Sequence, residues 1–444
     1  KGNTQIFLEN PGDIFRWIPG RKGVFGGAFV RDDKKGICVY EDGAFRDIFE
    51  TKVTDELKIL RPGREIYMIT DAGSEFARLV SIDIESCTLK EIHSRDGIDI
   101  EGIIWSENGL PGGVIYEPDG REIDFLDAEL QRKHLALAGF FPDCRIDFKG
   151  RTTDGELCFL NSDTEPGRWI IWHSEEQSPE LLAVERMNIQ SEDLCPMEFF
   201  MADDIPCYLT FPEGERRNLP LMVQPHGGPD SRDYRKVMER AQFFASRGYL
   251  VLHVNFRCST GYGRAHREGG YGKWGSLVQD DIYRATRWAI DRGFADTERV
   301  GVLGMSFGGF SALWQVIRHP ELFKYAVAIC PVTDLPAVSK KLRPEEGLLI
   351  EKYRLEMGNP DEDVTPLWNE SPMSRWQNIS CPVFLTHAEN DTIVPVEQTL
   401  ELHSLIKDRV KTELYIMEKG GHLLSDAVKR MEMYRRIERF LEEL

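Results

Sequence analysis

The stretch Gly304-Met305-Ser306-Phe307-Gly308, followed by Gly309, decides the fold of the second half of the chain. It lies between an apolar run, Arg299-Val300-Gly301-Val302-Leu303, and a run typical of a helix at 310–317. A strand, a Gly-x-Ser-x-Gly turn and a helix together predict a nucleophile elbow, a tight turn that holds a serine hydroxyl clear of a sheet. Because a bare Gly-x-Ser-x-Gly also arises by chance in a chain with 39 glycines, the interpretation depends on partners elsewhere.

A serine hydroxyl becomes a good nucleophile only when a base removes its proton, and in this architecture the chain order is serine, acid, histidine. Three histidines follow Ser306 beyond its own helix: His387, His403 and His422. His403 falls within a predicted helix, and His387 ends a strand-like run, where we expect it to pack. His422 stands on a loop after a late strand, so it is the predicted base.

The acid of such a site should stand on a loop after the preceding strand. Asp391 follows the strand-like run 382–386 and is the predicted acid, with the task of fixing the histidine tautomer. Glu389 is its neighbour, and Asp334, after the run 325–330, is the alternative. Aspartate also commonly caps a turn without any part in chemistry.

An oxyanion needs two preorganised hydrogen-bond donors. The backbone N–H of Phe307, directly after the serine, is the first predicted donor. The second should follow an early strand, and the strand-like run 219–225 leads into His226-Gly227-Gly228-Pro229. Glycine lets the backbone approach a substrate oxygen closely, and we predict the N–H of Gly228 as the second donor. No second ligand lies at a usable spacing from His226, so a metal role is not expected for it.

A chain of 444 residues exceeds one ordinary core and predicts two domains, at 1–193 and 194–444. The first domain is predicted to be all-β, because short alternating runs precede turn clusters that begin at residues 41, 71, 117 and 161. This spacing is near the period of β-propeller blades and favours a propeller-like domain of about four blades, with a β-sandwich as the alternative.

In the second domain, strand-like runs alternate with helical ones, which predicts an α/β-hydrolase domain built on a mainly parallel sheet with helices on both faces. The loops that carry the candidate site residues then leave the carboxyl edge of that sheet. The predicted strands are 219–225, 249–255, 299–303, 325–330, 382–387 and 412–417, and the predicted helices are about 232–247, 277–292, 307–319, 395–408 and 425–443.

The composition excludes several classes of partner. A net charge of −19 argues against nucleic-acid and anionic-membrane partners, because phosphates would be repelled. The sequence holds no apolar run long enough for a transmembrane helix and no signal-peptide pattern at its start. Nine cysteines without a C-x-x-C pair argue against a zinc site and a complete disulfide framework and favour the cytoplasm. We expect no cofactor and no metal. Cys258 lies on a loop near the predicted site, where a thiol is either reactive or, as is commoner for free cysteine, buried.

The second half resembles the prolyl oligopeptidase family of serine peptidases, in particular its acylaminoacyl-peptidase branch. The likeness covers about 250 residues. The resemblance implies that a propeller precedes the hydrolase domain and limits entry to short or unfolded peptides. The stretches that carry it are Pro225-His226-Gly227-Gly228-Pro229, Asn255-Phe256-Arg257-Cys258-Ser259-Thr260-Gly261-Tyr262-Gly263, Gly304 to Phe310, Pro320-Glu321-Leu322-Phe323 and the loops of Asp391 and His422.

The chain departs from the pattern of this family in four ways. Cys258 stands where the family usually has glycine, and Ile393 stands where many relatives have an arginine or asparagine that contacts the substrate backbone. Relatives commonly have seven or more blades, whereas about four fit here. The segment that normally precedes the propeller is not recognisable. An incomplete propeller edge would also favour a homo-oligomer.

Three functions remain open from the sequence. The first is a serine hydrolase that cleaves amide bonds of short or N-blocked peptides through an acyl-enzyme intermediate. The second retains the Ser306, Asp391 and His422 triad but acts as a carboxylesterase, or as a hydrolase or acyltransferase of small-molecule amides. The third is a non-catalytic binding scaffold, which is disfavoured because every triad and oxyanion residue is present.

Overall fold

The computed structural model describes residues 8–20, 23–31, 33–61, 65–173, 176–341 and 348–444. By backbone contacts the chain forms two compact units. Unit 1 comprises Lys1–Gly102, Gly261–Gly272 and Pro336–Leu367, and unit 2 comprises the remaining segments. This division follows contacts alone, and the domain boundary predicted at 193/194 stays a prediction.

Two four-stranded antiparallel sheets make up most of unit 1, with their strands in chain order. Residues two apart along a strand face the same side of a sheet, and Ile66 and Met68 of β6 and Val80 and Ile82 of β7 share one apolar cluster in this way. One apolar cluster joins these residues to Ile37 and others of the first sheet. The strands are β1 (Ile14–Gly20), β2 (Gly23–Arg31), β3 (Lys34–Glu41), β4 (Ala44–Lys52), β5 (Leu57–Arg61), β6 (Glu65–Thr70), β7 (Arg78–Asp83) and β8 (Leu89–His93).

Unit 2 begins with two more sheets, so in the described residues four sheets precede the large one, in agreement with the propeller-like first region. Helix α1 (Ala128–Phe140) interrupts the all-β pattern. Asp127 caps this helix, and Leu137 packs into the core of the second sheet beside Trp172. The strands are β9 (Gly102–Trp105), β10 (Pro111–Tyr116) and β11 (Glu122–Phe125) in the first sheet, and β12 (Arg145–Arg151), β13 (Glu156–Asn161), β14 (Arg168–His173) and β15 (Ser178–Val184) in the second.

An eight-stranded sheet forms the core of unit 2, in the order β16-β17-β19-β18-β20-β21-β22-β23. The strands from β19 through β23 in this order pair in parallel, and β16 and β17 add an antiparallel edge. The predicted mainly parallel sheet is therefore confirmed. The strands are β16 (Met197–Ala202), β17 (Ile205–Thr210), β18 (Leu219–Pro225), β19 (Leu250–Val254), β20 (Ala295–Met305), β21 (Tyr325–Ile329), β22 (Val383–Ala388) and β23 (Thr412–Met417).

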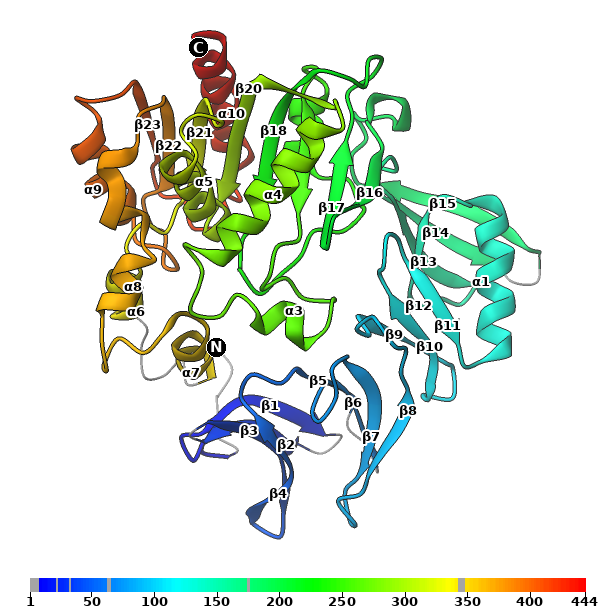
Figure 1. The fold of residues 1–444 in the computed structure, drawn as a ribbon. Coiled ribbons are helices and arrows are strands. Elements are labelled where there is room, and N and C mark those ends of the chain that lie inside the picture. The colour runs from blue at the N-terminus through cyan, green and yellow to red at the C-terminus, as the bar shows by residue number, and fades with distance from the viewer. Residues whose placement is uncertain (1–7, 21–22, 32, 62–64, 174–175, 342–347) are drawn as a thin grey trace. The chain divides into compact units, whose positions relative to one another are not determined.

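Helices cover this sheet on its two faces (Figure 1). On one face, α2 (Glu239–Ala245) and α10 (Ala427–Glu442) share an apolar cluster with the strands, in which Phe440 contacts Phe384 edge-on. Helix α5 (Phe307–Arg318) packs on β20 and β21, and all six residues of β22 are buried, as expected for a strand covered on both sides. The other helices are α3 (Arg264–Glu268), α4 (Leu277–Asp291), α6 (Leu335–Ser339), α7 (Leu348–Met357), α8 (Thr365–Asn369), α9 (Glu397–Ile406), and the 3₁₀ helices η1 (Ser191–Asp193) and η3 (Pro372–Asn378).

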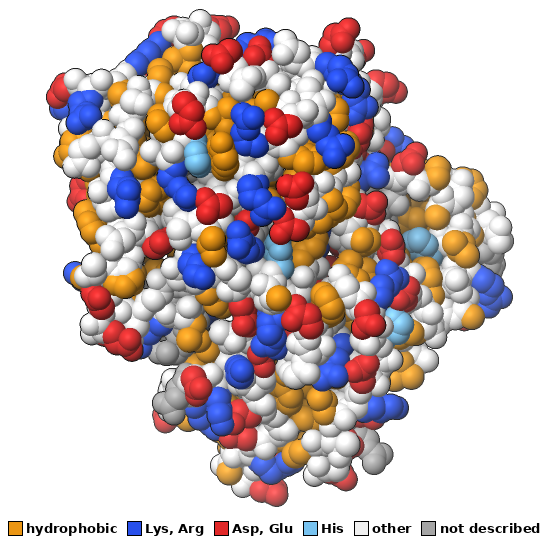
Figure 2. Space-filling model, in the orientation of Figure 1, with side chains coloured by type: hydrophobic (Ala, Val, Ile, Leu, Met, Phe, Trp, Pro, Cys, Tyr) orange, Lys and Arg blue, Asp and Glu red, His pale blue; other side chains and the backbone are white. Residues whose placement is uncertain are grey.

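The surface carries both signs of charge. In the view of Figure 2, Lys and Arg side chains are interspersed with Asp and Glu and do not form one basic field. Within the described ranges, every helix is too short or too polar to cross a membrane.

Candidate active site

The predicted elbow is present in the structure, because β20 leads directly into Ser306 and α5 begins at the next residue. The backbone of Ser306 has φ 59° and ψ −120°, a strained conformation for a residue with a side chain. Its N–H donates a 2.8 Å hydrogen bond to the carbonyl of Ile329, which holds the turn on the neighbouring strand. A Cβ on Gly304 would overlap the backbone of Gly308, and a Cβ on Gly308 would overlap the carbonyl of Pro225. The turn therefore accepts only glycine on either side of the serine.

The His226-Gly227-Gly228 loop lies beside the nucleophile. It follows β18, and a Cβ built on Gly227 would lie 3.7 Å from the Cβ of Ser306. Gly228 has φ 126°, a backbone conformation that favours glycine. The loop thus occupies the position that an oxyanion loop requires, while the N–H groups of Gly228 and Phe307 stay predicted donors.

A buried histidine holds this loop. His226 Nε2 lies 2.8 Å from Ser259 Oγ, and Nδ1 lies 2.7 Å from the carbonyl of Gly227. The ring stacks on Phe256 with 4.2 Å between centroids. Burial lowers the pKa of His226, so the ring is neutral at pH 7 and acts as a hydrogen-bonding support for the glycines.

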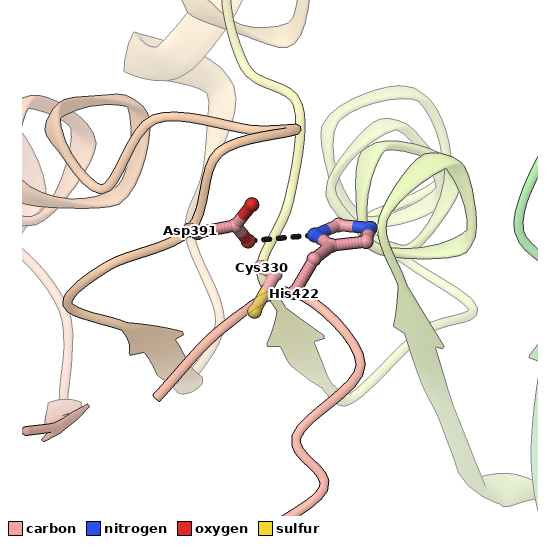
Figure 3. Close-up of side chains that lie close together, drawn as sticks. All are labelled: Cys330, Asp391 and His422. Atoms are coloured by element: carbon pink, nitrogen blue, oxygen red, sulfur yellow. Dashed lines mark hydrogen bonds and ion pairs between the residues drawn. The ribbon is translucent and has the colours of Figure 1, made fainter. Parts of the chain in front are cut away.

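Asp391 and His422 form a close pair on the loops after β22 and β23 (Figure 3). His422 Nδ1 lies 2.6 Å from Asp391 Oδ2, and the other carboxylate oxygen accepts the N–H groups of Ile393 and Val394 at 2.9 Å. Burial opposes ionisation of Asp391, but the hydrogen bonds from His387, His422 and Val394 outweigh it and hold its pKa well below the usual range. The carboxylate is therefore ionised and fixes the proton of His422 on Nδ1, which leaves Nε2 as the basic nitrogen.

The alternative residues have other surroundings. His387 is fully buried at the strand end, where it packs as predicted, and its ring nitrogens lie 2.7 Å from Thr399 Oγ1 and 2.9 Å from the carbonyl of Val394. Its Nε2 also lies 3.4 Å from Asp391 Oδ2, so His387 supports the carboxylate from the buried side. His403 is half-buried in the last turn of α9. The backbone N–H of Asp334 donates to Gln398 Oε1. The carboxylate that contacts His422 is that of Asp391.

The elbow sets the position of Ser306, the third member of the predicted triad. In the described part of the chain, the hydroxyl of Ser306 makes no hydrogen bond with the ring of His422. Such contacts are often long in structures without substrate and tighten when substrate binds. The structure thus brings Asp391 and His422 together, and the partnership of Ser306 with them stays a prediction.

Two departures noted in the sequence can now be located. Cys258 is fully buried and has φ 87°, so it occupies a left-handed backbone position with its thiol shielded from solvent. The structure thus agrees with the commoner of the two expectations for Cys258, a buried free cysteine. Ile393 is 62% exposed next to Asp391 and offers an apolar surface.

Sequence reasoning missed Cys330. This residue directly follows β21, has φ 44° and is fully buried. Burial, together with the charge of Asp391, raises the pKa of its thiol to about 12. A cysteine immediately after a central strand, at the edge that carries the other site loops, was the signal that could have identified it.

The mainly parallel, doubly covered sheet and the serine elbow at its carboxyl edge define an α/β-hydrolase. Residues 235–444 match the model of the prolyl oligopeptidase family. The family prediction from the sequence is confirmed.

Individual relatives agree with this assignment. The chain is 24% identical over 382 residues to dipeptidyl aminopeptidase BIII of Pseudoxanthomonas mexicana, covering 79% of this chain and 53% of that protein. It is 29% identical over 425 residues to dipeptidyl peptidase family member 6 of Caenorhabditis elegans, covering 85% of this chain and 56% of that protein. The chain thus spans about half the length of these curated relatives.

Among solved structures, the acylaminoacyl peptidase of Pyrococcus horikoshii aligns with a TM-score of 0.70 at 20% identity. The alignment covers 93% of this chain and 67% of that one. At this identity the likeness supports the fold, which combines antiparallel sheets with an α/β-hydrolase sheet.

Proposed function

We propose that this chain carries the catalytic apparatus of a serine peptidase that hydrolyses amide bonds of short or N-blocked peptides. The observation that carries the proposal is the Ser306 elbow at the same sheet edge as the Asp391–His422 pair. An ionised, buried acid bonded to a histidine has the arrangement that a general base needs. The relatives named as peptidases support an amide substrate.

In the proposed reaction, Ser306 Oγ attacks the scissile carbonyl while Nε2 of His422 removes its proton. The N–H groups of Gly228 and Phe307 hold the oxyanion that develops. His422 then returns the proton to the leaving amine, and an acyl-enzyme forms on Ser306. Water, activated by the same histidine, releases the acyl group, and Asp391 stabilises the imidazolium in both steps.

The test is labelling with a fluorophosphonate probe followed by mass spectrometry of the modified peptide. We expect one adduct on Ser306, and we expect it to disappear in His422→Ala. His403→Ala is the matched control, because this histidine stands on α9 away from the predicted triad, and labelling should persist. A folded parent protein that never labels at Ser306 would overturn the proposal and favour a binding scaffold.

Ile393 favours a second candidate, hydrolysis of esters or small-molecule amides. Its exposed apolar side chain stands where a polar residue would anchor a peptide backbone in the resemblance described above. Turnover of an acyl-peptide and of an ester with the same acyl group separates the two candidates. A preference for the ester that exceeds its intrinsic reactivity, and that falls in Ile393→Asn, would support the second one.

A further inference from the structure

Three side chains with different metal-binding atoms meet at the edge of the large sheet. Cys330, Asp391 and His422 follow the successive strands β21, β22 and β23. The Sγ, one carboxylate oxygen and one ring nitrogen all lie within 4.8 Å of one another, and Figure 3 shows the thiol beside the acid–histidine pair. The proposed hydrolysis needs the acid and the histidine but gives the thiol no task.

Backbone contacts hold two of the three ligands in place. The N–H of Cys330 donates a 2.8 Å hydrogen bond to the carbonyl of Thr386 on β22. Asp391 is fixed through Oδ1 by two backbone N–H groups, which leaves Oδ2 facing His422. Because these backbone contacts position Cys330 and Asp391, binding would require little ordering of the protein.

The donor set indicates which ion would bind. Thiolate, imidazole and carboxylate are the usual ligands of Zn²⁺, whereas Mg²⁺ and Ca²⁺ take oxygen ligands. Three protein ligands leave the fourth tetrahedral position to water. The side chain of His422 is 13% exposed and gives the ion a path from solvent.

We propose that Cys330, Asp391 and His422 form a Zn²⁺ site whose occupation switches the hydrolase off. The inhibitory role rests on the proposed function, while the site itself does not. On binding, the thiol loses its proton to solvent and a zinc–sulfur bond forms. If the ion takes Nδ1 of His422, that proton moves to Nε2; if it takes Nε2, the nitrogen that serves Ser306 is occupied. Either arrangement removes the base.

Zinc binding requires a small rearrangement of the pair. Nδ1 of His422 and Oδ2 of Asp391 are now 2.6 Å apart. Two such ligands on a tetrahedral Zn²⁺ lie roughly 3.3 Å apart, as its bond lengths of about 2.0–2.2 Å require. If Nδ1 is the ligand, the His422 ring must therefore move by less than about 1 Å.

The first experiment measures metal binding without activity. Co²⁺, which replaces Zn²⁺ and is coloured, is titrated into the full chain while the near-ultraviolet thiolate-to-cobalt band is recorded. We expect the band in the parent protein and in Cys381→Ala, a matched buried cysteine outside the site. In Cys330→Ala the band should be lost and Co²⁺ affinity should fall by about 10–100-fold or more. No band, or a band that persists in Cys330→Ala, overturns the site.

The second experiment measures inhibition, as the ratio of fluorophosphonate labelling with and without Zn²⁺ for each variant. Zn²⁺ should lower labelling about tenfold in the parent protein and less than about twofold in Cys330→Ala. Equal inhibition of both proteins overturns the inhibitory role. A cobalt band that depends on Cys330 in a protein that never labels would support the metal site while overturning the proposed function, so the two failures are distinguishable.

Discussion

At the scale of single residues, the Asp391 carboxylate is the feature on which the proposed chemistry depends most. We predict that Asp391→Asn lowers kcat for an activated ester by about 10⁴, because an amide that accepts and donates no longer fixes the tautomer of His422. Stopped-flow turnover measures this. Glu389→Gln is the control, since Glu389 lies on the same loop and accepts the N–H of Lys419. An unchanged kcat in Asp391→Asn would remove Asp391 from the triad.

Lys35 offers a second residue-scale prediction, on stability. It is 9% exposed, and burial, followed by the charge of Lys352, lowers its pKa from 10.5 to about 8. Between these two pH values the unfolded chain binds more protons than the folded one, so the free energy of unfolding should rise with pH across this window. Below pH 8, protonated Lys35 destabilises the fold by up to about 3 kcal/mol.

Urea unfolding from pH 7 to 10 tests this. Lys35→Met should raise stability at pH 7 and flatten the rise, whereas Lys34→Met should change neither, because Lys34 is exposed and pairs with Glu50 at the surface. If the free energy of unfolding depended on pH in the same way in the parent protein and in Lys35→Met, the prediction would be contradicted.

How much of the candidate site could be predicted from the sequence differs from residue to residue. Asp391 and His422 could be named because each stands on a loop after a strand and the chain order of serine, acid and histidine narrows the choice, with Asp334 left as the alternative acid. Cys330 carried only the weaker signal of its place directly after a central strand, and its meeting with Asp391 and His422 depends on how three separate loops close in space. Likewise, the absence of C-x-x-C spacing excluded only metal sites built from one local segment.

At the scale of elements, the elbow makes a sharp prediction. Gly308→Ala should destabilise the protein by about 3 kcal/mol or more, because the new Cβ meets the Pro225 carbonyl, a backbone atom that cannot rotate away. Gly139→Ala is the control: Gly139 is exposed in α1 with open space around its Cβ position, and alanine there should stabilise by about 0.5–1 kcal/mol. Urea unfolding measures both, and equal effects would contradict the elbow geometry.

Strands marked by a clear apolar run were the easiest elements to predict from the sequence. The predicted strands 219–225 and 412–417 coincide with β18 and β23, because continuous or alternating apolar runs mark them clearly. Strands β16 and β17 went unpredicted, although they extend the sheet as its antiparallel edge. Helix α1 was missed as well, because alternating runs dominate the region around it, although Asp127 before a run of good helix formers was a usable start signal.

At the scale of the whole molecule, separate parts of the sequence build unit 1 around buried ion pairs. Arg267, 5% exposed, pairs at 2.7 Å with Asp71, which is 1% exposed. We predict that Asp71→Asn destabilises the protein by about 3–5 kcal/mol, because the buried guanidinium of Arg267 loses its nearer carboxylate and keeps only Glu268, at 3.5 Å. Glu298→Gln, which breaks the surface pair with Lys324, should cost less than about 1 kcal/mol. Thermal unfolding compares the Asp71→Asn and Glu298→Gln variants, and similar Tm values for these two variants would refute the prediction.

The segmented construction of unit 1 also has a consequence for synthesis on the ribosome. Asp71 and Arg267 are 196 residues apart in the chain. At about 5–20 residues per second, roughly 10–40 s pass between the translation of the two. Through this interval the acidic side chains of the nascent first sheets lack their arginine partners, and the unit is complete only after its last segment, Pro336–Leu367, has been made. The first segment of unit 1 is therefore synthesised early and its last segment late. Folding of unit 1 can be completed only after the sequence between its segments, which includes much of the hydrolase sheet, has been translated.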